Sequence, residues 1–237
     1  MALSKIEWTE ETWNPITGCT KCSDGCMHCY AATFARRLQA MGNPRYSNGF
    51  QVTIHEDLIE KPLDWKKPKL VFVNSMSDLF HDDIPDETIL RIFDVMNRAS
   101  LHTFQVLTKR SMRLMKLSSK IKWTPNIWMG VSIENQSAIP RCEDLKKTGA
   151  VIKFISAEPL LGPLPTLDLN NIDWLIVGGE SGAGSRPIEE DWVLALQQMA
   201  AKTNTAFFFK QWGGFNKKKN GKLLQGKIVQ EYPYKFR

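Results

Sequence analysis

The chain has 237 residues, of which 43% are hydrophobic and 24% charged, and its net charge at pH 7 is +6. This balance is typical of a globular protein, and no apolar run approaches the roughly 18 residues that a membrane-spanning helix needs. The composition therefore argues against a membrane protein, and the length fits a single β/α barrel domain over residues 1–237.

The first residues, Met1 to Trp8, contain neither a basic start followed by an apolar stretch nor a small-residue cleavage site. We therefore expect a cytoplasmic protein. The basic net charge fits a polyanionic partner such as nucleic acid, because basic surfaces attract phosphate backbones. The same charge is also common in proteins that bind no nucleic acid, so both interpretations stay open.

Four of the five cysteines lie within eleven residues, at Cys19, Cys22, Cys26 and Cys29. Such clustering favours a metal or iron–sulfur site over disulfides. Glycines and turn formers around them predict a loop, and the stretch 31–41 that follows predicts a helix, whose N-terminus favours thiolates. Two chemistries compete here: four thiolates around a tetrahedral zinc ion, or three thiolates holding an iron–sulfur cluster with one iron left open.

From residue 70 onward one pattern repeats, in which a short apolar run is followed by a polar cluster and then by helical spacing. This order is typical of βα units. Helices are predicted at Asp86–Ala99 and Asp191–Lys202. The predicted strands are Leu70–Asn74, Thr103–Thr108, Ile127–Ile133, Val151–Ser156, Trp174–Val177 and Ala206–Lys210.

These strands are apolar nearly throughout, which predicts a parallel sheet buried on both faces with right-handed crossovers. Polar residues follow every strand; a barrel would bring them all to one mouth, whereas a doubly wound sheet would gather only a few. Their number favours a partial or complete β/α (TIM-like) barrel, although each alone also fits an ordinary turn or cap. They are Ser75, Asp78, Lys109, Arg110, Glu134, Asn135, Glu158, Gly178, Gly179, Glu180, Ser181, Gln211 and Trp212.

Two features outside this pattern have plain interpretations. The tract Asn216–Lys222, with three consecutive lysines, predicts an exposed hairpin loop within a basic C-terminal hairpin extension of about residues 213–237, and a solvated turn is favoured over a phosphate contact. Cys142 lies in a polar helical stretch, where an inert, half-buried thiol is expected.

The segment Cys22–Cys29 matches the C-x3-C-x2-C spacing of the radical S-adenosylmethionine superfamily, and the residues Gly25 to Ala31 resemble the loop of spore photoproduct lyase and its relatives. This resemblance implies a radical-S-adenosylmethionine-like barrel with the cysteine loop after its first strand. It also implies two cofactors, a 4Fe–4S cluster and S-adenosylmethionine, whose amino and carboxylate groups chelate the open iron.

Longer blocks make the chain similar to the phage and bacterial three-cysteine-motif family, long filed as a domain of unknown function. That family brings no settled substrate with it. The matching blocks, in order, are Trp13–Ala31, Asn74–His81, Leu107–Arg110, Gly130–Asn135, Glu158–Pro163, Gly178–Gly182 and Phe208–Gly213.

The two resemblances imply different cluster ligands. In the three-cysteine-motif family the shared cysteines correspond to Cys19, Cys26 and Cys29, and the position of Cys22 is usually aliphatic. The superfamily spacing selects Cys22, Cys26 and Cys29 instead. We favour the family triad, with Cys22 as a spare thiol or an alternative ligand.

A bound S-adenosylmethionine would need acceptors for its ammonium group and partners for its carboxylate and ribose. Two glycines beside a carboxylate, at Gly178, Gly179 and Glu180, would suit such a ligand, although Glu180 is equally suited to cap the next helix. Ser75 and Asp78 are the best candidates after the early strands, because that segment is too polar for a helix start chosen by propensity alone.

Further candidates come from charge and aromatic character. Lys109 and Arg110 would bind a carboxylate or phosphate, and Glu134 or Glu158 would meet ribose hydroxyls, with surface ion pairing as the alternative. Trp212 follows a strand directly and either stacks on a base or fills the core.

The residues and the resemblance together predict an enzyme that reductively cleaves S-adenosylmethionine to a 5′-deoxyadenosyl radical. It would use an external electron donor and act on nucleic acid or a nucleotide, as in DNA repair or modification. One alternative is a zinc-stabilised nucleic-acid-binding protein that uses all four clustered cysteines. The other is a phage or host-defence factor whose cluster is structural or sensory and whose task is to bind a partner.

Overall fold

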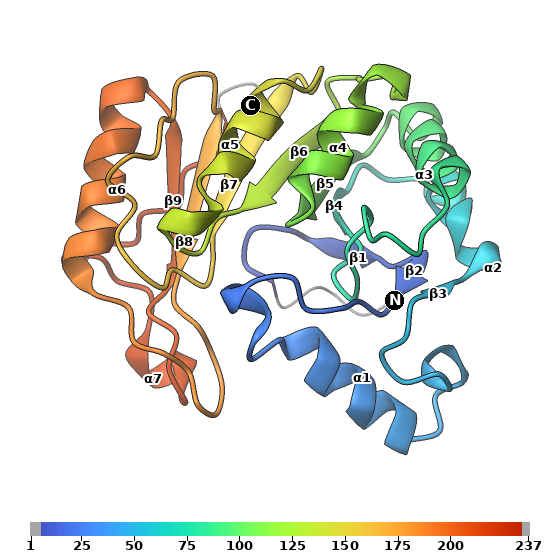
Figure 1. The fold of residues 1–237 in the computed structure, drawn as a ribbon, viewed down its shortest axis with the longest axis horizontal. Helices are drawn as coiled ribbons and strands as arrows, with labels where there is room; N and C mark the ends of the chain where they lie inside the picture. Colours follow the sequence, from blue (N-terminus) through green and yellow to red (C-terminus); the bar gives the residue numbers. More distant parts are fainter. Residues whose placement is uncertain (1–5, 234–237) are drawn as a thin grey trace.

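The computed structural model of the chain describes residues 6–233. Seven parallel strands form one sheet in the order β1-β4-β5-β6-β7-β8-β9, and the sheet curls into a half-barrel (Figure 1). The predicted TIM-like barrel is thus confirmed as a partial one. The strands are β1 (Glu11–Trp13), β4 (Leu70–Val73), β5 (Thr103–Thr108), β6 (Ile127–Ser132), β7 (Ile152–Ala157), β8 (Trp174–Gly178) and β9 (Ala206–Gln211).

Helices cover the outer face of the sheet, and a small antiparallel pair, β2 (Ile16–Thr17) and β3 (Thr53–Ile54), flanks the start of the chain. The α-helices are α1 (Tyr30–Ala40), α2 (Glu56–Ile59), α3 (Asp86–Arg98), α4 (Ser111–Leu117), α5 (Pro140–Lys146), α6 (Glu190–Thr203) and α7 (Lys217–Asn220). The 3-10 turns are η1 (Asp24–Cys26), η2 (Pro44–Tyr46), η3 (Lys61–Asp64), η4 (Ser118–Lys120) and η5 (Gln136–Ala138).

All six strands predicted from residue 70 onward lie within one residue of their observed bounds, and the three predicted helices correspond to α1, α3 and α6. Two details differ. The tract predicted as a hairpin loop contains the short helix α7, and the chain reverses later, where Leu224 and Lys227 exchange backbone hydrogen bonds. Cys142 is fully buried in α5 rather than half-buried, because it lies on the face that packs against the sheet.

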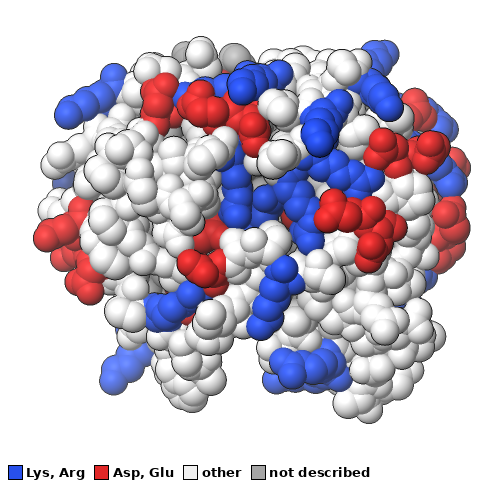
Figure 2. All heavy atoms as spheres, viewed as in Figure 1, with Lys and Arg blue, Asp and Glu red and all other residues white. Residues whose placement is uncertain are grey.

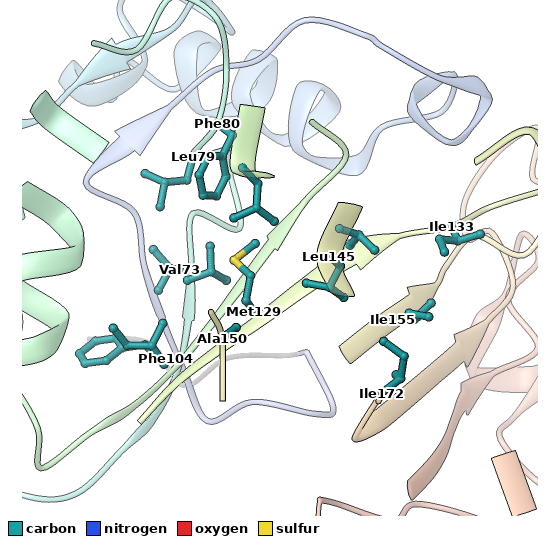
Figure 3. Packing of buried hydrophobic residues seen from close by; sticks show 14 of the residues in the cluster. Val73, Leu79, Phe80, Phe104, Met129, Ile133, Leu145, Ala150, Ile155 and Ile172 are labelled. Atoms are coloured by element: carbon teal, nitrogen blue, oxygen red, sulfur yellow. The ribbon is translucent and has the colours of Figure 1, made fainter. Parts of the chain in front are cut away.

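Alternation along the strands divides the buried residues into two layers, since successive side chains point to opposite faces of a sheet. The outward layer packs against the helices (Figure 3), with Val73, Phe104, Met129 and Ile155 from four neighbouring strands and Leu145 from α5. This layer is continuous along the sheet and forms the main hydrophobic core.

The inward layer is aromatic and fills the lower part of the half-barrel. Trp174 is fully buried at its centre, and its ring lies 5.9 Å from that of Trp128, 5.7 Å from that of Phe154 and 5.8 Å from that of Phe208. A side chain at Gly130 would come within 2.5 Å of the Phe154 ring, so only glycine fits beside this layer. The interior is therefore closed below, and a ligand has access only from the carboxyl ends of the strands.

Among residues 6–233, no helix combines the length and the apolar character that crossing a bilayer requires.

Replacing Trp174 by Ala should lower the free energy of unfolding by about 3–5 kcal/mol, because it removes the central ring of the aromatic layer and leaves a cavity. Urea unfolding followed by circular dichroism measures the change. The matched control is Leu101→Ala, at a side chain that is 52% exposed, where a loss below about 1 kcal/mol is expected. Equal losses in the two variants would contradict the assignment of Trp174 to the core.

Candidate functional site

The carboxyl ends of the seven strands form the open mouth of the half-barrel, and basic side chains gather in the hollow at the middle of the face shown in Figure 2. Every ligand-binding residue predicted from the sequence lies at a strand end or just after it. Ser75 and Asp78 follow β4, Lys109 follows β5, Glu134 follows β6, Glu158 follows β7, Gly178 ends β8, and Gly179 and Glu180 come next.

The cysteine loop leaves β1 through β2 and crosses this mouth. It is joined to the segment after β4 by a bridge between Gly18 and Ser77, makes the turn η1, and ends at Cys29, the residue before α1. Gly18 has a φ of 88°, and a side chain there would meet the carbonyl of Gln51 at 2.1 Å, so glycine is required at the entrance of the loop. The position of the cysteines after the first strand agrees with the sequence-based expectation.

Asp78 and Arg110 hold the first part of the loop. Arg110 Nη1 lies 3.2 Å from Asp78 Oδ2 and donates to Cys19 Sγ at 3.6 Å, while Nη2 donates to the carbonyl of Thr20 at 3.2 Å. Thr108 fixes the carboxylate from the other side through a bond of 2.6 Å. Burial raises the pKa of the Cys19 thiol, and the Arg110 charge partly opposes that effect.

Glu134 and Arg141 hold the middle of the loop. Glu134 is fully buried, accepts from Arg141 Nη1 at 2.7 Å and from the backbone N–H of Gly25 at 3.3 Å. Asn135 adds a bond of 3.0 Å to the side chain of Asp24. Burial alone would raise the pKa of Glu134, but hydrogen bonding within the site and the Arg141 charge lower it, so the group is a carboxylate.

Glu180 and Arg186 hold the last part of the loop. Arg186 Nη2 lies 2.5 Å from Glu180 Oε1 and donates to the carbonyl of Asp24 at 2.9 Å, and His28 Nδ1 lies 3.0 Å from Glu180 Oε2. Burial would raise the pKa of Glu180, yet the hydrogen bonds from Arg186 and His28 lower it to about 2. Glu180 thus contacts the cysteine loop and does not cap the next helix, which begins ten residues later at Glu190.

These three ion pairs, which we call the carboxylate–arginine clamps, tie the cysteine loop to the ends of β4, β6 and β8 and to the residues around them. They are Asp78–Arg110, Glu134–Arg141 and Glu180–Arg186. In each clamp the carboxylate oxygens are already occupied by protein donors. The clamps therefore position the loop, and a ligand role for these three acids stays a prediction.

The sulfurs of the loop form a set of free thiols. Cys22 Sγ and Cys26 Sγ are 4.0 Å apart, and Ser23 Oγ lies 3.8 Å from the same Cys26 sulfur. The hydrogen bond between the two sulfurs lowers the pKa of Cys26. Within residues 6–233, no three His, Cys, Asp or Glu side chains converge tightly enough to hold a single metal ion. A cluster binds each thiolate through a separate iron, so a cluster does not require the thiolates to converge on one point.

The floor of the mouth, above the aromatic layer, is lined by inward-facing residues near the strand ends. Lys210 Nζ pairs with Glu158 Oε1 at 2.6 Å, and Lys109 Nζ donates to Ser132 Oγ at 3.1 Å. In the described part of the chain the Lys109 ammonium pairs with no carboxylate. The Lys109 charge also helps to lower the pKa of Glu134 and of Cys26, so Lys109 belongs to the electrostatic surroundings of the cysteine loop.

Gly179 has a packing role. A side chain at Gly179 would meet the carbonyl of Trp212 at 2.1 Å, so β8 and β9 approach too closely at their ends for any other residue. Trp212 itself packs against Phe209, with ring centroids 4.7 Å apart, and donates from Nε1 to the Leu223 carbonyl. Both features are explained by contacts within the protein, whatever ligand the mouth holds.

Several residues of the site escaped the sequence-based prediction. Arg141 and Arg186 lie seven and six residues from the acids that they pair with, in segments without any motif, and His28 is hidden among the cysteines. Lys210 could have been predicted from the sequence, because it lies two residues after the inward-facing Phe208 in β9 and so faces inward as well. Tyr30 is a further addition, since its hydroxyl donates to the Ser75 carbonyl at 2.5 Å.

A comparison with known families gives a match that covers almost the whole chain. The family model described as "Protein of unknown function (DUF5131)" matches residues 3–233. No curated protein and no solved structure matches the chain.

Replacing Glu180 by Gln should loosen the cysteine loop, because the neutral amide loses the charge-assisted bonds from Arg186 and His28. Such bonds contribute about 1.5–3 kcal/mol each, so amide exchange in residues 24–28 should become roughly ten times faster or more. Hydrogen exchange with mass spectrometry measures this. In the control Glu143→Gln, which breaks an exposed pair with Lys146, exchange in the loop should be unchanged. A loop that exchanges equally in both variants contradicts the clamp.

Proposed function

Because the chain belongs to the DUF5131 family, whose description assigns no activity, we propose a function from the site itself: a radical S-adenosylmethionine enzyme whose 4Fe–4S cluster is held by Cys19, Cys26 and Cys29. The observation that carries this proposal is the place of the cysteine loop. It comes after β1 and the short strand β2 and is clamped across the mouth of a partial parallel barrel. That is the arrangement expected from the resemblance to the superfamily.

When bound, the cluster and S-adenosylmethionine would supply a one-electron reduction and a 5′-deoxyadenosyl radical. The residues of this chain would bind, orient and shield. Lys109 offers a donor for a carboxylate or phosphate, and the Lys210–Glu158 pair offers a donor and an acceptor beside it. The aromatic layer around Trp174 keeps water from entering from below.

The preferred substrate is nucleic acid or a nucleotide, and DNA repair or modification is the preferred process. The basic net charge and the unpaired Lys109 at the mouth support an anionic substrate. The proposal also requires an external electron donor, because the one-electron reduction of S-adenosylmethionine needs an electron that the protein side chains do not provide.

A structural zinc site is the second candidate function for the loop, favoured by one distance. Two thiolates on one tetrahedral zinc ion, each about 2.3 Å from it, lie about 3.8 Å apart, and Cys22 and Cys26 are separated by 4.0 Å. A zinc site would use Cys22 as a full ligand. The cluster proposal, by contrast, leaves Cys22 as a spare thiol.

Anaerobic purification should give a brown protein with about four irons and four sulfides per chain. Incubation of the reduced protein with S-adenosylmethionine should release 5′-deoxyadenosine, measured by liquid chromatography with mass spectrometry. A colourless protein with one zinc per chain would establish the second candidate instead. A brown protein that leaves S-adenosylmethionine intact would show that the cluster is structural.

The identity of the third ligand is tested by separate Cys19→Ala and Cys22→Ala variants. We expect Cys19→Ala to lose most of its iron and the visible absorption of the 4Fe–4S cluster. Cys22→Ala should keep both. Cys142→Ala, at a buried thiol outside the loop, is the control and should also keep both. The opposite result for Cys19 and Cys22 assigns the superfamily triad.

A further inference from the structure

The helix that follows the cysteine loop belongs to a segment with an unusual charge distribution. From Gly25 to His55 the chain contains no aspartate and no glutamate, although acidic residues are frequent elsewhere. The same segment contains Arg36, Arg37 and Arg45. On the face shown in Figure 2, the lobe that Figure 1 identifies as α1 carries basic and uncharged atoms and no acidic ones.

One face of α1 packs against the protein and the other is exposed. Ala31 and Ala35 are buried, in a small cluster that includes Met76. About a quarter turn round the helix from these alanines, Tyr30 is 58% exposed and Phe34 is 46% exposed. These two aromatic residues are one turn apart on the same side of the helix, about 6 Å along its axis.

Met41 and Arg37 continue this exposed side toward the end of the helix, by the same spacing of three and four residues. Met41 is 73% exposed. Arg36 and Arg37 are both exposed, and among the described residues neither is paired with a carboxylate, whereas Arg45 pairs with Asp57 at 2.6 Å. The face thus combines aromatic rings with the unpaired positive charge of Arg37, while Arg36 lies farther round the helix, on a different side from Tyr30 and Phe34.

The exposed face is continuous with the mouth of the half-barrel. Tyr30 follows Cys29 directly, and its hydroxyl reaches the carbonyl of Ser75 at the end of β4. A chain lying along α1 would therefore enter the mouth over Tyr30, beside the cysteine loop.

We propose that this face of α1, formed by Tyr30, Phe34, Arg37 and Met41, binds single-stranded nucleic acid and leads it into the mouth. Aromatic rings stack on unpaired bases of any sequence, and arginines contact the phosphates between them. The phosphate backbone complements a segment that has no acidic residue. A duplex keeps its bases stacked inside and offers no ring to Tyr30 or Phe34. The inference rests on the proposed function only for what happens to the strand after it is bound.

Fluorescence anisotropy with a labelled twelve-nucleotide oligothymidylate tests this on the full-length protein, without need of a cluster. Phe34→Ala should weaken binding by at least about fivefold, the value of one lost stacking contact. The variant Arg37→Ala should weaken binding and reduce the slope of log affinity against log salt by about 0.7, the value of one phosphate contact on a single strand.

Matched controls come from the opposite end of the sheet. Lys66→Ala/Lys67→Ala changes two exposed lysines before β4, and Leu101→Ala changes an exposed apolar residue before β5. Both should bind the oligonucleotide as the unchanged protein does. Equal weakening in the control and α1 variants would overturn the proposal, as would absence of binding at low salt. Circular dichroism checks that every variant is folded.

An acidic electron-donor protein is the competing occupant of the same face. If the α1 variants slow reduction of the loaded protein by reduced flavodoxin while their oligonucleotide affinity is unchanged, the face belongs to that donor and the proposal is overturned. A failed 5′-deoxyadenosine assay with intact, α1-dependent oligonucleotide binding would instead reject only the proposed function.

Discussion

The site depends on ionic contacts that fasten a polar loop across the end of a sheet. A cysteine loop rich in glycine and turn residues has little apolar surface of its own, so burial alone cannot fix it. The three carboxylate–arginine clamps replace that missing contribution with directed bonds to Cys19, Gly25 and His28. Breaking a buried pair costs about 3–5 kcal/mol, whereas forming one adds little net stability, so the clamps determine where the loop lies rather than whether the barrel folds.

The inward-facing side chains of the half-barrel form two layers, one low on the strands and one at their carboxyl ends. Inward positions low on the strands are aromatic, as in Phe154 and Trp174, and the inward positions at the strand ends are polar, as in Ser132 and Glu158. Because both layers come from the same strands by the same alternation, a shift of one residue would turn the inward rings toward the helices, and a shift of two residues would move a ring up into the mouth. The aromatic layer thus fixes the height at which the polar residues stand.

The sequence predicted most of the fold and less of the site, for identifiable reasons. The six longer strands are continuous apolar runs, a pattern that burial on both faces imposes, but β1 has only three residues, with Glu11 and Thr12 among them, and gave no such signal. Strand ends were predicted as the site because parallel strands share one mouth. The arginine partners of the acids were not predicted. The pairing of Glu180 with Arg186 forms only in the folded loop and produces no periodic pattern in the sequence.

Charge also separates the residues that hold the loop from those left for a ligand. Asp78, Glu134 and Glu180 are each balanced by an arginine, and Glu158 is balanced by Lys210. Lys109 makes no salt bridge among residues 6–233: its ammonium group donates to the hydroxyl of Ser132, and its charge acts on Glu134 and Cys26 from a greater distance. The ammonium group of Lys109 is half-buried and lies 3.1 Å from the neutral oxygen of Ser132. Because that oxygen carries no charge, the ammonium group retains much of its attraction for an anion. The acids that look most like ligand-binding residues in the sequence are therefore the ones most engaged within the protein, and Lys109 is bound less tightly than they are.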